Sequence, residues 1–284
     1  MARALPTDRD YRNVIIPRWV RGEIEAFRPP SPSELAAQSR QFIPLIRAYL
    51  PSYRESAILE LGCGFGSLLR AFVDEGYRNL KAIDLIPECC AFVKEHVGIE
   101  PRCVDLLTFL AEEEGSYDAI IAIDVIEHFT KREIVAIVER LYEFLKPGGI
   151  FIMRVPNGGS LGGLGVRYGG FTHETAFTPG SVNELFRAIG FEPIACLPDP
   201  VFAKSPLQGS LKRALRWASE QVISLGAMRF IDARFAVSLN VTGVGRKPFR
   251  ARVSPVSRAA EVRAGRAATH GGEHEQERER EHDT

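Results

Sequence analysis

Residues 57–66 read AILELGCGFG, and this stretch decides the fold. Its first five residues form a short apolar run, which predicts a buried strand, and glycines follow at alternate positions. Glycine has no Cβ, so the backbone can turn sharply and approach a ligand closely. The amides that open the predicted helix over 68–74 favour a negatively charged group such as a carboxylate. The stretch therefore predicts a strand, a tight turn and a helix that together hold a ligand.

Short apolar runs and longer amphipathic segments alternate on both sides of this turn. The predicted strands are 57–61, 80–84, 101–105, 117–124 and 150–155, followed later by 191–197 and 235–247. The predicted helices between them are 68–74, 88–97, 106–111, 131–145 and 179–189. Strands that alternate with helices pair in parallel. We therefore predict an α/β fold with a Rossmann-like, doubly wound and mostly parallel sheet of seven strands.

The chain divides into three parts. Residues 1–50 are an N-terminal segment with a helix over the active site, which runs from Glu34 to Leu50 after Ser33 as N-cap. Residues 51–249 form the ligand-binding domain, in which 157–170 is a glycine-rich loop and 198–235 a helical insertion. Residues 250–284 have almost no large apolar side chains, which predicts a disordered tail.

The composition excludes several classes of protein. Lys plus Arg equals Asp plus Glu at 36 each, so nothing favours a nucleic-acid partner. The cysteine count, 5, is odd and no C-x-x-C pair occurs, which indicates reduced thiols in a cytoplasmic protein. We see neither a signal peptide nor a transmembrane segment. The oligomeric state stays open.

Two cofactors compete for the glycine turn. A dinucleotide fingerprint needs its third glycine at position 67, where this chain has Ser67 after Gly66. Glu60 stands two places before the first glycine, where a carboxylate repels a pyrophosphate but suits the ammonium of an amino acid. Asp84 ends the next strand, at the separation from which an acid binds ribose hydroxyls. These features favour S-adenosyl-L-methionine over NAD.

At this point the chain resembles the class I S-adenosylmethionine-dependent methyltransferases. The motifs that carry the resemblance are E-x-G-x-G-x-G at 60–66, the acid ending the second strand, YDAIIAIDVIEHF at 117–129 and LKPGG at 145–149. The resemblance implies a methionine end lined by Glu60, Gly62, Gly64 and Gly66. It implies a nucleoside end formed by Asp84 at the ribose, Leu85 beside the adenine, Asp105 at the adenine amino group and Leu106. Asp124, at the end of the fourth strand, is either a further cofactor contact or a helix cap.

Two histidines are candidates for the catalytic base. A hydroxyl nucleophile benefits from a base, and the pKa of histidine suits this role. His128 lies just beyond the fourth strand, where the family's IEH motif favours an orienting role. His173 follows the glycine-rich segment, which is well placed to be a substrate lid. Asp124, Glu127 and His128 could approach a divalent cation, as in quinone O-methyltransferases that resemble this pattern with a glutamate in place of Asp124. We predict no metal.

The acceptor is the least determined feature. The stretch GGFTHETAFTP at 169–179 resembles methyltransferases of bacterial sugar and surface-polysaccharide biosynthesis. We therefore expect O-methylation of a hydroxyl on a sugar or glycan precursor. A quinone or other small aromatic is the alternative acceptor, and an inactive cofactor-binding module is the alternative from another class.

A basic amphipathic helix is predicted near 211–225, with Lys212, Arg213 and Arg216 beside Leu211 and Leu215. One interpretation is a peripheral contact of the 210–225 helix with a membrane or an anionic lipid-linked acceptor. The other is a helix that packs over the active-site mouth with its charges solvated.

Overall fold

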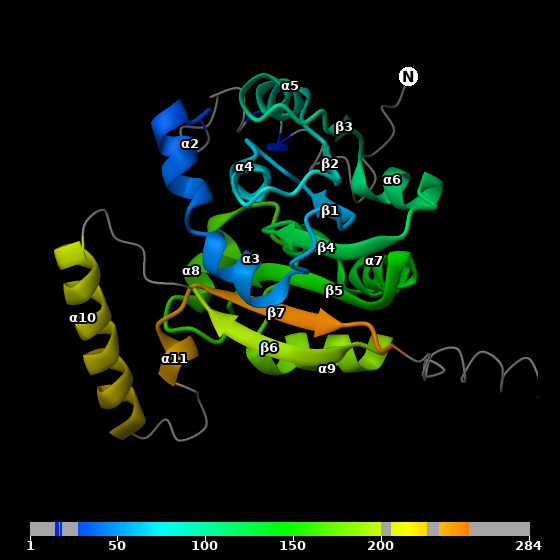
Figure 1. Ribbon diagram of the computed structural model, residues 1–284. Helices are drawn as coiled ribbons and strands as arrows, with labels where there is room; N and C mark the ends of the chain where they lie inside the picture. Colours follow the sequence, from blue (N-terminus) through cyan, green and yellow to red (C-terminus); the bar gives the residue numbers. More distant parts are fainter. Residues whose placement is uncertain (1–14, 17, 19–27, 200–205, 226–232, 250–284) are drawn as a thin grey trace, which may run out of the picture.

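The computed structural model describes residues 15, 16, 18, 28–199, 206–225 and 233–249 (Figure 1). Its centre is a seven-stranded sheet in the order β3-β2-β1-β4-β5-β7-β6. The strands are β1 (Ile58–Leu61), β2 (Leu80–Asp84), β3 (Arg102–Cys103), β4 (Tyr117–Ile123), β5 (Leu145–Pro156), β6 (Glu192–Pro198) and β7 (Asn240–Arg246). Strand β7 runs antiparallel to both of its neighbours, and the other pairs are parallel. The predicted doubly wound, mostly parallel sheet is confirmed.

Helices cover both faces of the sheet (Figure 1). They are α2 (Pro32–Ser39), α3 (Ile43–Tyr49), α4 (Ser67–Asp74), α5 (Pro87–His96), α6 (Leu106–Glu112), α7 (Lys131–Phe144), α8 (Gly163–Gly169), α9 (Pro179–Ile189), α10 (Pro206–Leu225) and α11 (Ala233–Ala236). Alternate strand residues point to opposite faces. Leu59 therefore packs with α6, α7 and α9, whereas its neighbour Ile58 packs with α3, α4 and α5. The central strands are buried on both sides, which explains their nearly continuous apolar sequences.

The N-terminal helix differs from its prediction, because two helices replace one. The N-cap of α2 is Ser31 rather than Ser33, and Ser31 forms a capping box with Glu34. Pro44 lies in the first turn of α3. Proline lacks an amide hydrogen and is tolerated only at a helix start, so the chain begins a new helix there.

Three segments of the second half also differ from their predictions. The expected loop at 157–170 contains the helix α8. The last strand begins at Asn240, because residues Ala233–Ala236 form α11. The insertion helix α10 begins at Pro206, five residues before the predicted start at Leu211. The predicted tail at 250–284 lies outside the described residues.

Candidate functional site

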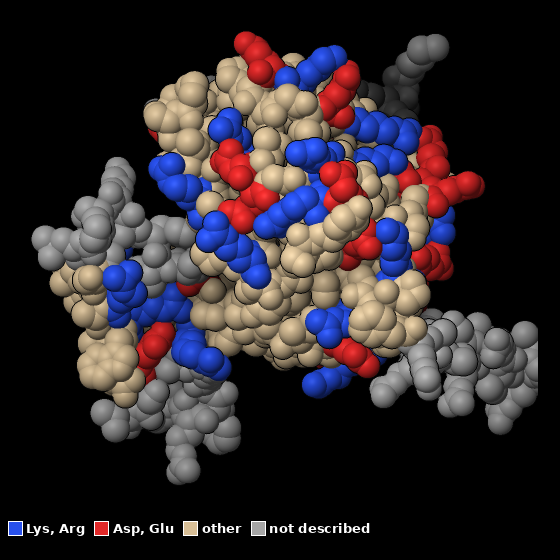
Figure 2. All heavy atoms as spheres, in the orientation of Figure 1, with Lys and Arg blue, Asp and Glu red and all other residues tan. Residues whose placement is uncertain are grey.

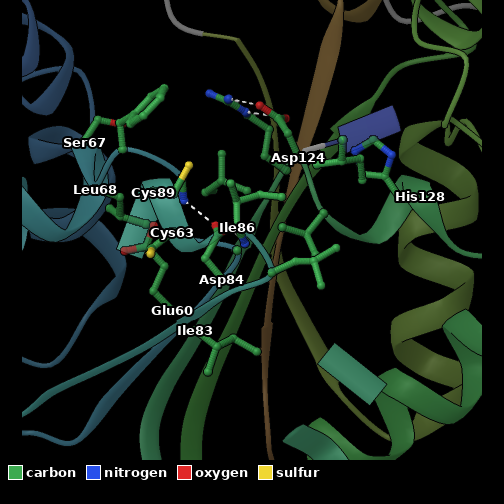
Figure 3. Close-up of a pocket in the computed structure, with 18 of the residues that line it drawn as sticks. Glu60, Cys63, Ser67, Leu68, Ile83, Asp84, Ile86, Cys89, Asp124 and His128 are labelled. Atoms are coloured by element: carbon green, nitrogen blue, oxygen red, sulfur yellow. Dashed lines mark hydrogen bonds and ion pairs between the residues drawn. The ribbon is translucent and has the colours of Figure 1, made fainter. Parts of the chain in front are cut away.

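A cavity of about 600 Å³ opens at the carboxyl ends of β1, β2 and β4 (Figure 3). This edge is where parallel α/β sheets bind their ligands. Glu34 and Gln38 of α2, together with Phe42, also line it. Its lining carries five carboxyl groups and two guanidinium groups. Such a cavity attracts a cationic ligand and disfavours a pyrophosphate.

The turn after β1 has a backbone that only glycine adopts readily. Gly62, Gly64 and Gly66 have φ angles of 66°, 51° and 77°. A Cβ at Gly62 would lie 2.5 Å from Cγ2 of Val125, and one at Gly66 would lie 2.8 Å from Cγ2 of Val93. Both contacts are too close for any side chain. The glycine spacing therefore reflects backbone geometry and packing as well as ligand approach.

Glu60 lies on β1, below this turn, and lines the cavity (Figure 3). It is 3% exposed, and its Oε2 has no hydrogen-bond partner among the described residues. Burial, and then the nearby charge of Asp84, raise the pKa of Glu60 well above its ordinary value. A buried carboxyl oxygen without a partner is costly, and a cationic donor removes this cost. Glu60 therefore fits an ammonium group.

Asp84 ends β2 beside Glu60 (Figure 3). Its Oδ2 accepts from the amide of Gly64 at 2.7 Å, and its Oδ1 from the amide of Ile86 at 2.9 Å. Burial raises the pKa of Asp84, although these backbone hydrogen bonds oppose the shift. Each carboxylate oxygen can accept a second hydrogen bond. Asp84 thus orders the glycine turn and retains capacity for two ligand hydroxyls.

The adjacent wall of the cavity comes from the loops after β2 and β3. Leu85, Asp105 and Leu106 all line it. Asp105 is also the N-cap of α6, where its Oδ1 accepts from the amides of Leu107 at 3.0 Å and Thr108 at 3.3 Å. Asp105 thus combines a place in the cavity wall with a capping role that the sequence did not predict.

Asp124 does not cap a helix, because Val125 is the N-cap of the short 3₁₀ helix Ile126–His128. The carboxylate of Asp124 instead forms a bidentate ion pair with Arg154 on β5, with Nε to Oδ1 at 3.0 Å. Among the described residues other than glycine, only Asp124 has a positive φ, 56°. The side chains of Asp124 and Arg154 both line the cavity. Sequence reasoning missed Arg154, although a charge within the apolar run IFIMRV was a signal.

The two candidate histidines are neighbours, with ring centroids 5.1 Å apart. His128 lines the cavity, and its Nδ1 lies 3.1 Å from the carbonyl oxygen of Thr172. His173 is not among the residues that line the cavity, and its Nδ1 lies 3.0 Å from the carbonyl oxygen of Val166. A carbonyl only accepts, so each Nδ1 donates its hydrogen and the neutral ring keeps its lone pair at Nε2.

Glu127, rather than Asp124, lies with the two histidines in a group of side chains that could hold a metal ion. Ligand atoms of Glu127, His128 and His173 lie within 4.8 Å of one another. Glu127 is 1% exposed, and burial followed by the charge of Asp124 raises its pKa well above the ordinary value. Its Oε2 has no partner among the described residues. The grouping of Asp124 with Glu127 and His128 that the sequence suggested is therefore replaced by a different one.

Comparison with known proteins agrees with this geometry. Residues 58–149 match a family model described as a methyltransferase domain. The ubiquinone biosynthesis O-methyltransferase of Xanthomonas campestris pv. campestris (strain B100) is 31% identical over 131 residues, 43% of this chain and 52% of that protein. The protein of that name from Xylella fastidiosa (strain M23) is 33% identical over 97 residues, 32% of this chain and 38% of that protein. The chain thus spans about half, or less, of the length of these relatives.

Solved structures show the same architecture. A S-adenosylmethionine-dependent methyltransferase from Archaeoglobus fulgidus superimposes with a TM-score of 0.55 at 16% identity, over 76% of this chain and 95% of that chain. Magnesium protoporphyrin IX methyltransferase from Synechocystis PCC 6803, with bound S-adenosylhomocysteine, gives 0.51 at 16% identity, over 84% of this chain and 97% of that chain. The chain therefore has the α/β Rossmann-like fold of S-adenosylmethionine-dependent methyltransferases, and its residues 58–149 match the methyltransferase-domain family.

Proposed function

We propose that this chain transfers a methyl group from S-adenosylmethionine to a hydroxyl of a small aromatic acceptor. The observation that carries the proposal is Glu60, which is buried at the cavity behind a glycine turn and whose Oε2 has no hydrogen-bond partner among the described residues. The residues present fit the cofactor: Glu60 would hold its ammonium, and Asp84 its ribose hydroxyls. The nucleoside wall would consist of Leu85, Asp105 and Leu106.

The cofactor supplies an activated methyl group on a sulfonium centre, and the chain has to position the acceptor in line with it. Of the two histidines, His128 is the one that lines the cavity. We therefore assign to His128 the role of the base that accepts the proton of the acceptor hydroxyl. His173, packed edge-on against His128, positions that ring.

An aromatic acceptor replaces the sugar that the sequence resemblance suggested. The curated relatives described above are named for ubiquinone biosynthesis, which supports the aromatic alternative. The cavity lining also includes the aromatic rings of Phe42, Phe65 and Phe129. Such rings suit a flat apolar acceptor, and a phenolic hydroxyl ionises more readily than a sugar hydroxyl. A histidine base is therefore strong enough to remove the proton of a phenolic hydroxyl.

The test combines binding with turnover. Calorimetry should show that the purified chain binds S-adenosylhomocysteine and not NAD. Incubation with methyl-labelled cofactor should then label a catechol and leave a methyl glycoside unlabelled. Labelling of the glycoside alone would restore the sugar acceptor, and cofactor binding without labelling of any hydroxyl compound would indicate an inactive binding module. NAD binding without S-adenosylhomocysteine binding would refute the proposal.

A further inference from the structure

Large apolar side chains that face solvent are concentrated on one side of the molecule. The described residues include fourteen exposed large apolar side chains, and nine of them lie within 161–171, 211–222 and residue 239. Four belong to α8 and its flanks: Leu161, Leu164, Tyr168 and Phe171, between 67% and 78% exposed. Clusters of exposed apolar side chains mark interaction sites in soluble proteins.

The helix α10 presents its apolar residues outward. Leu211, Leu215 and Val222 recur at helical spacing, so they share one face, and they are 60%, 59% and 70% exposed. Within residues 210–222, only Arg216 and Glu220 are partly buried. Lys212 and Arg213 are exposed, so both basic and apolar side chains of α10 face solvent. Among the described residues, no part of α10 lines the cavity.

Arg216 anchors this orientation. Its Nε donates to Glu220 at 2.9 Å, and its terminal nitrogens donate to the carbonyl oxygens of Asp199 at 2.6 Å and Arg234 at 3.1 Å. The segment before α8 also contacts α11, because the amide of Leu161 donates to the carbonyl oxygen of Ala236 at 2.8 Å. The helix α11 thus bridges α8 and α10 into one surface, which we name the α8–α10 surface.

The charge of the α8–α10 surface is strongly positive. Segments 157–171, 206–225 and 233–240 contain five basic residues (Arg167, Lys212, Arg213, Arg216 and Arg234) and one acidic residue, Glu220, a net charge of +4. Figure 2 shows mainly uncharged and basic side chains over α10. Basic residues that accompany exposed Leu, Trp and Val are the composition of helices that lie in a membrane interface.

We propose that the α8–α10 surface docks onto a lipid bilayer with anionic headgroups. A symmetric second copy is disfavoured, because a two-fold contact would set two positive surfaces against each other. No described helix has the length and apolar character that a membrane crossing requires. Thr172, which follows Phe171, contacts His128 through its carbonyl oxygen, so the surface adjoins the acceptor end of the cavity. That position suits a lipid-dissolved acceptor, a point that rests on the proposed function.

Vesicle co-sedimentation tests the docking on the full chain with bound S-adenosylhomocysteine. We expect binding to vesicles of equal parts phosphatidylcholine and phosphatidylglycerol, and much weaker binding to phosphatidylcholine alone. The triple variant Leu211→Gln, Leu215→Gln, Val222→Gln should lower the partition coefficient about tenfold or more. The matched control is Val73→Gln with Val135→Gln, which removes exposed apolar groups from α4 and α7 and should bind as the original chain does.

A fluorescence measurement locates the contact. In a Trp19→Phe variant Trp217, which is 64% exposed, is the remaining tryptophan, and its emission should shift to shorter wavelength when anionic vesicles are added. Equal sedimentation of the triple variant and the original chain would overturn the docking. So would a dimer in light scattering that the triple variant abolishes while vesicles bind neither form. The affinity for S-adenosylhomocysteine, measured without lipid, reports separately on the proposed function.

Discussion

Replacing Glu60 by Gln should weaken cofactor binding and remove part of its pH dependence. The unpartnered Oε2 would accept a charge-assisted hydrogen bond from the cofactor ammonium. Such bonds contribute about 1.5–3 kcal/mol, so their loss should raise Kd about 10- to 150-fold. Isothermal titration with S-adenosylhomocysteine measures this change directly. A Kd within about twofold of the original would remove Glu60 from the site.

The pH dependence follows from the raised pKa of Glu60. A cation binds better to the ionised carboxylate, so affinity should rise as the pH increases through the raised pKa, and cofactor binding should release a proton. The Glu60→Gln variant should lack this part of the pH dependence of cofactor affinity. Stability responds in the opposite direction. In the window between the ordinary pKa of 4.5 and the raised one, the folded chain without cofactor binds more protons than the unfolded chain, so its stability falls as pH rises.

Glu127→Gln is the matched control. Glu127 is equally buried and its pKa is also raised, but it does not line the cavity. In this variant, as in the Glu60→Gln variant, Tm should fall less steeply as the pH rises. Its cofactor affinity should be unchanged. If both variants lost affinity equally, the effect would come from altered packing rather than from a direct contact, and the reasoning for Glu60 would be refuted.

Four further predictions concern the remaining groups. Asp84→Ala should weaken S-adenosylhomocysteine binding by about 1.5–3 kcal/mol, and calorimetry that finds no change in a folded variant would exclude the ribose contact. His128→Ala should lower turnover by about 10²–10⁴-fold at unchanged cofactor affinity, and His173→Ala should lower it less; the reverse order in labelled-methyl assays would make His173 the base. Dialysis against a chelator should leave turnover intact, since transfer of a methyl group from a sulfonium needs positioning rather than a metal, and activity restored only by a divalent cation would assign an ion to Glu127, His128 and His173. Deleting residues 250–284 should leave Tm nearly unchanged by calorimetry, because the segment offers few apolar anchors.

The strands and the glycine turn could be predicted because their signals are local. Apolar runs such as 117–124 mark strands buried on both faces, and glycine spacing marks a turn with positive φ. The helix α8 could not be predicted, because its glycine-rich sequence opposes helix formation. Close packing accounts for one of those glycines, since a Cβ at Gly163 would lie 2.5 Å from the carbonyl oxygen of Gly158.

The sequence could indicate those candidate site residues that local patterns along the chain mark. Glu60 and Asp84 follow from positions along the chain, and the structure places both at the cavity. The pairing of Asp124 with Arg154 depends on the register between β4 and β5, which no local pattern specifies. The contact of His128 with His173 likewise joins segments that are distant in sequence and meet only through the fold.

The contact between Gly62 and Val125 has a consequence for redesign and for divergence of this chain. A methyl group at position 62 would overlap Cγ2 of Val125, so the two positions share one fixed volume. Position 62 belongs to the glycine turn at the cavity, and Val125 begins the segment that carries Glu127 and His128. A side chain at position 62 would therefore require a smaller residue than valine at position 125. The size of the residue after β4 thus limits what the turn after β1 can carry.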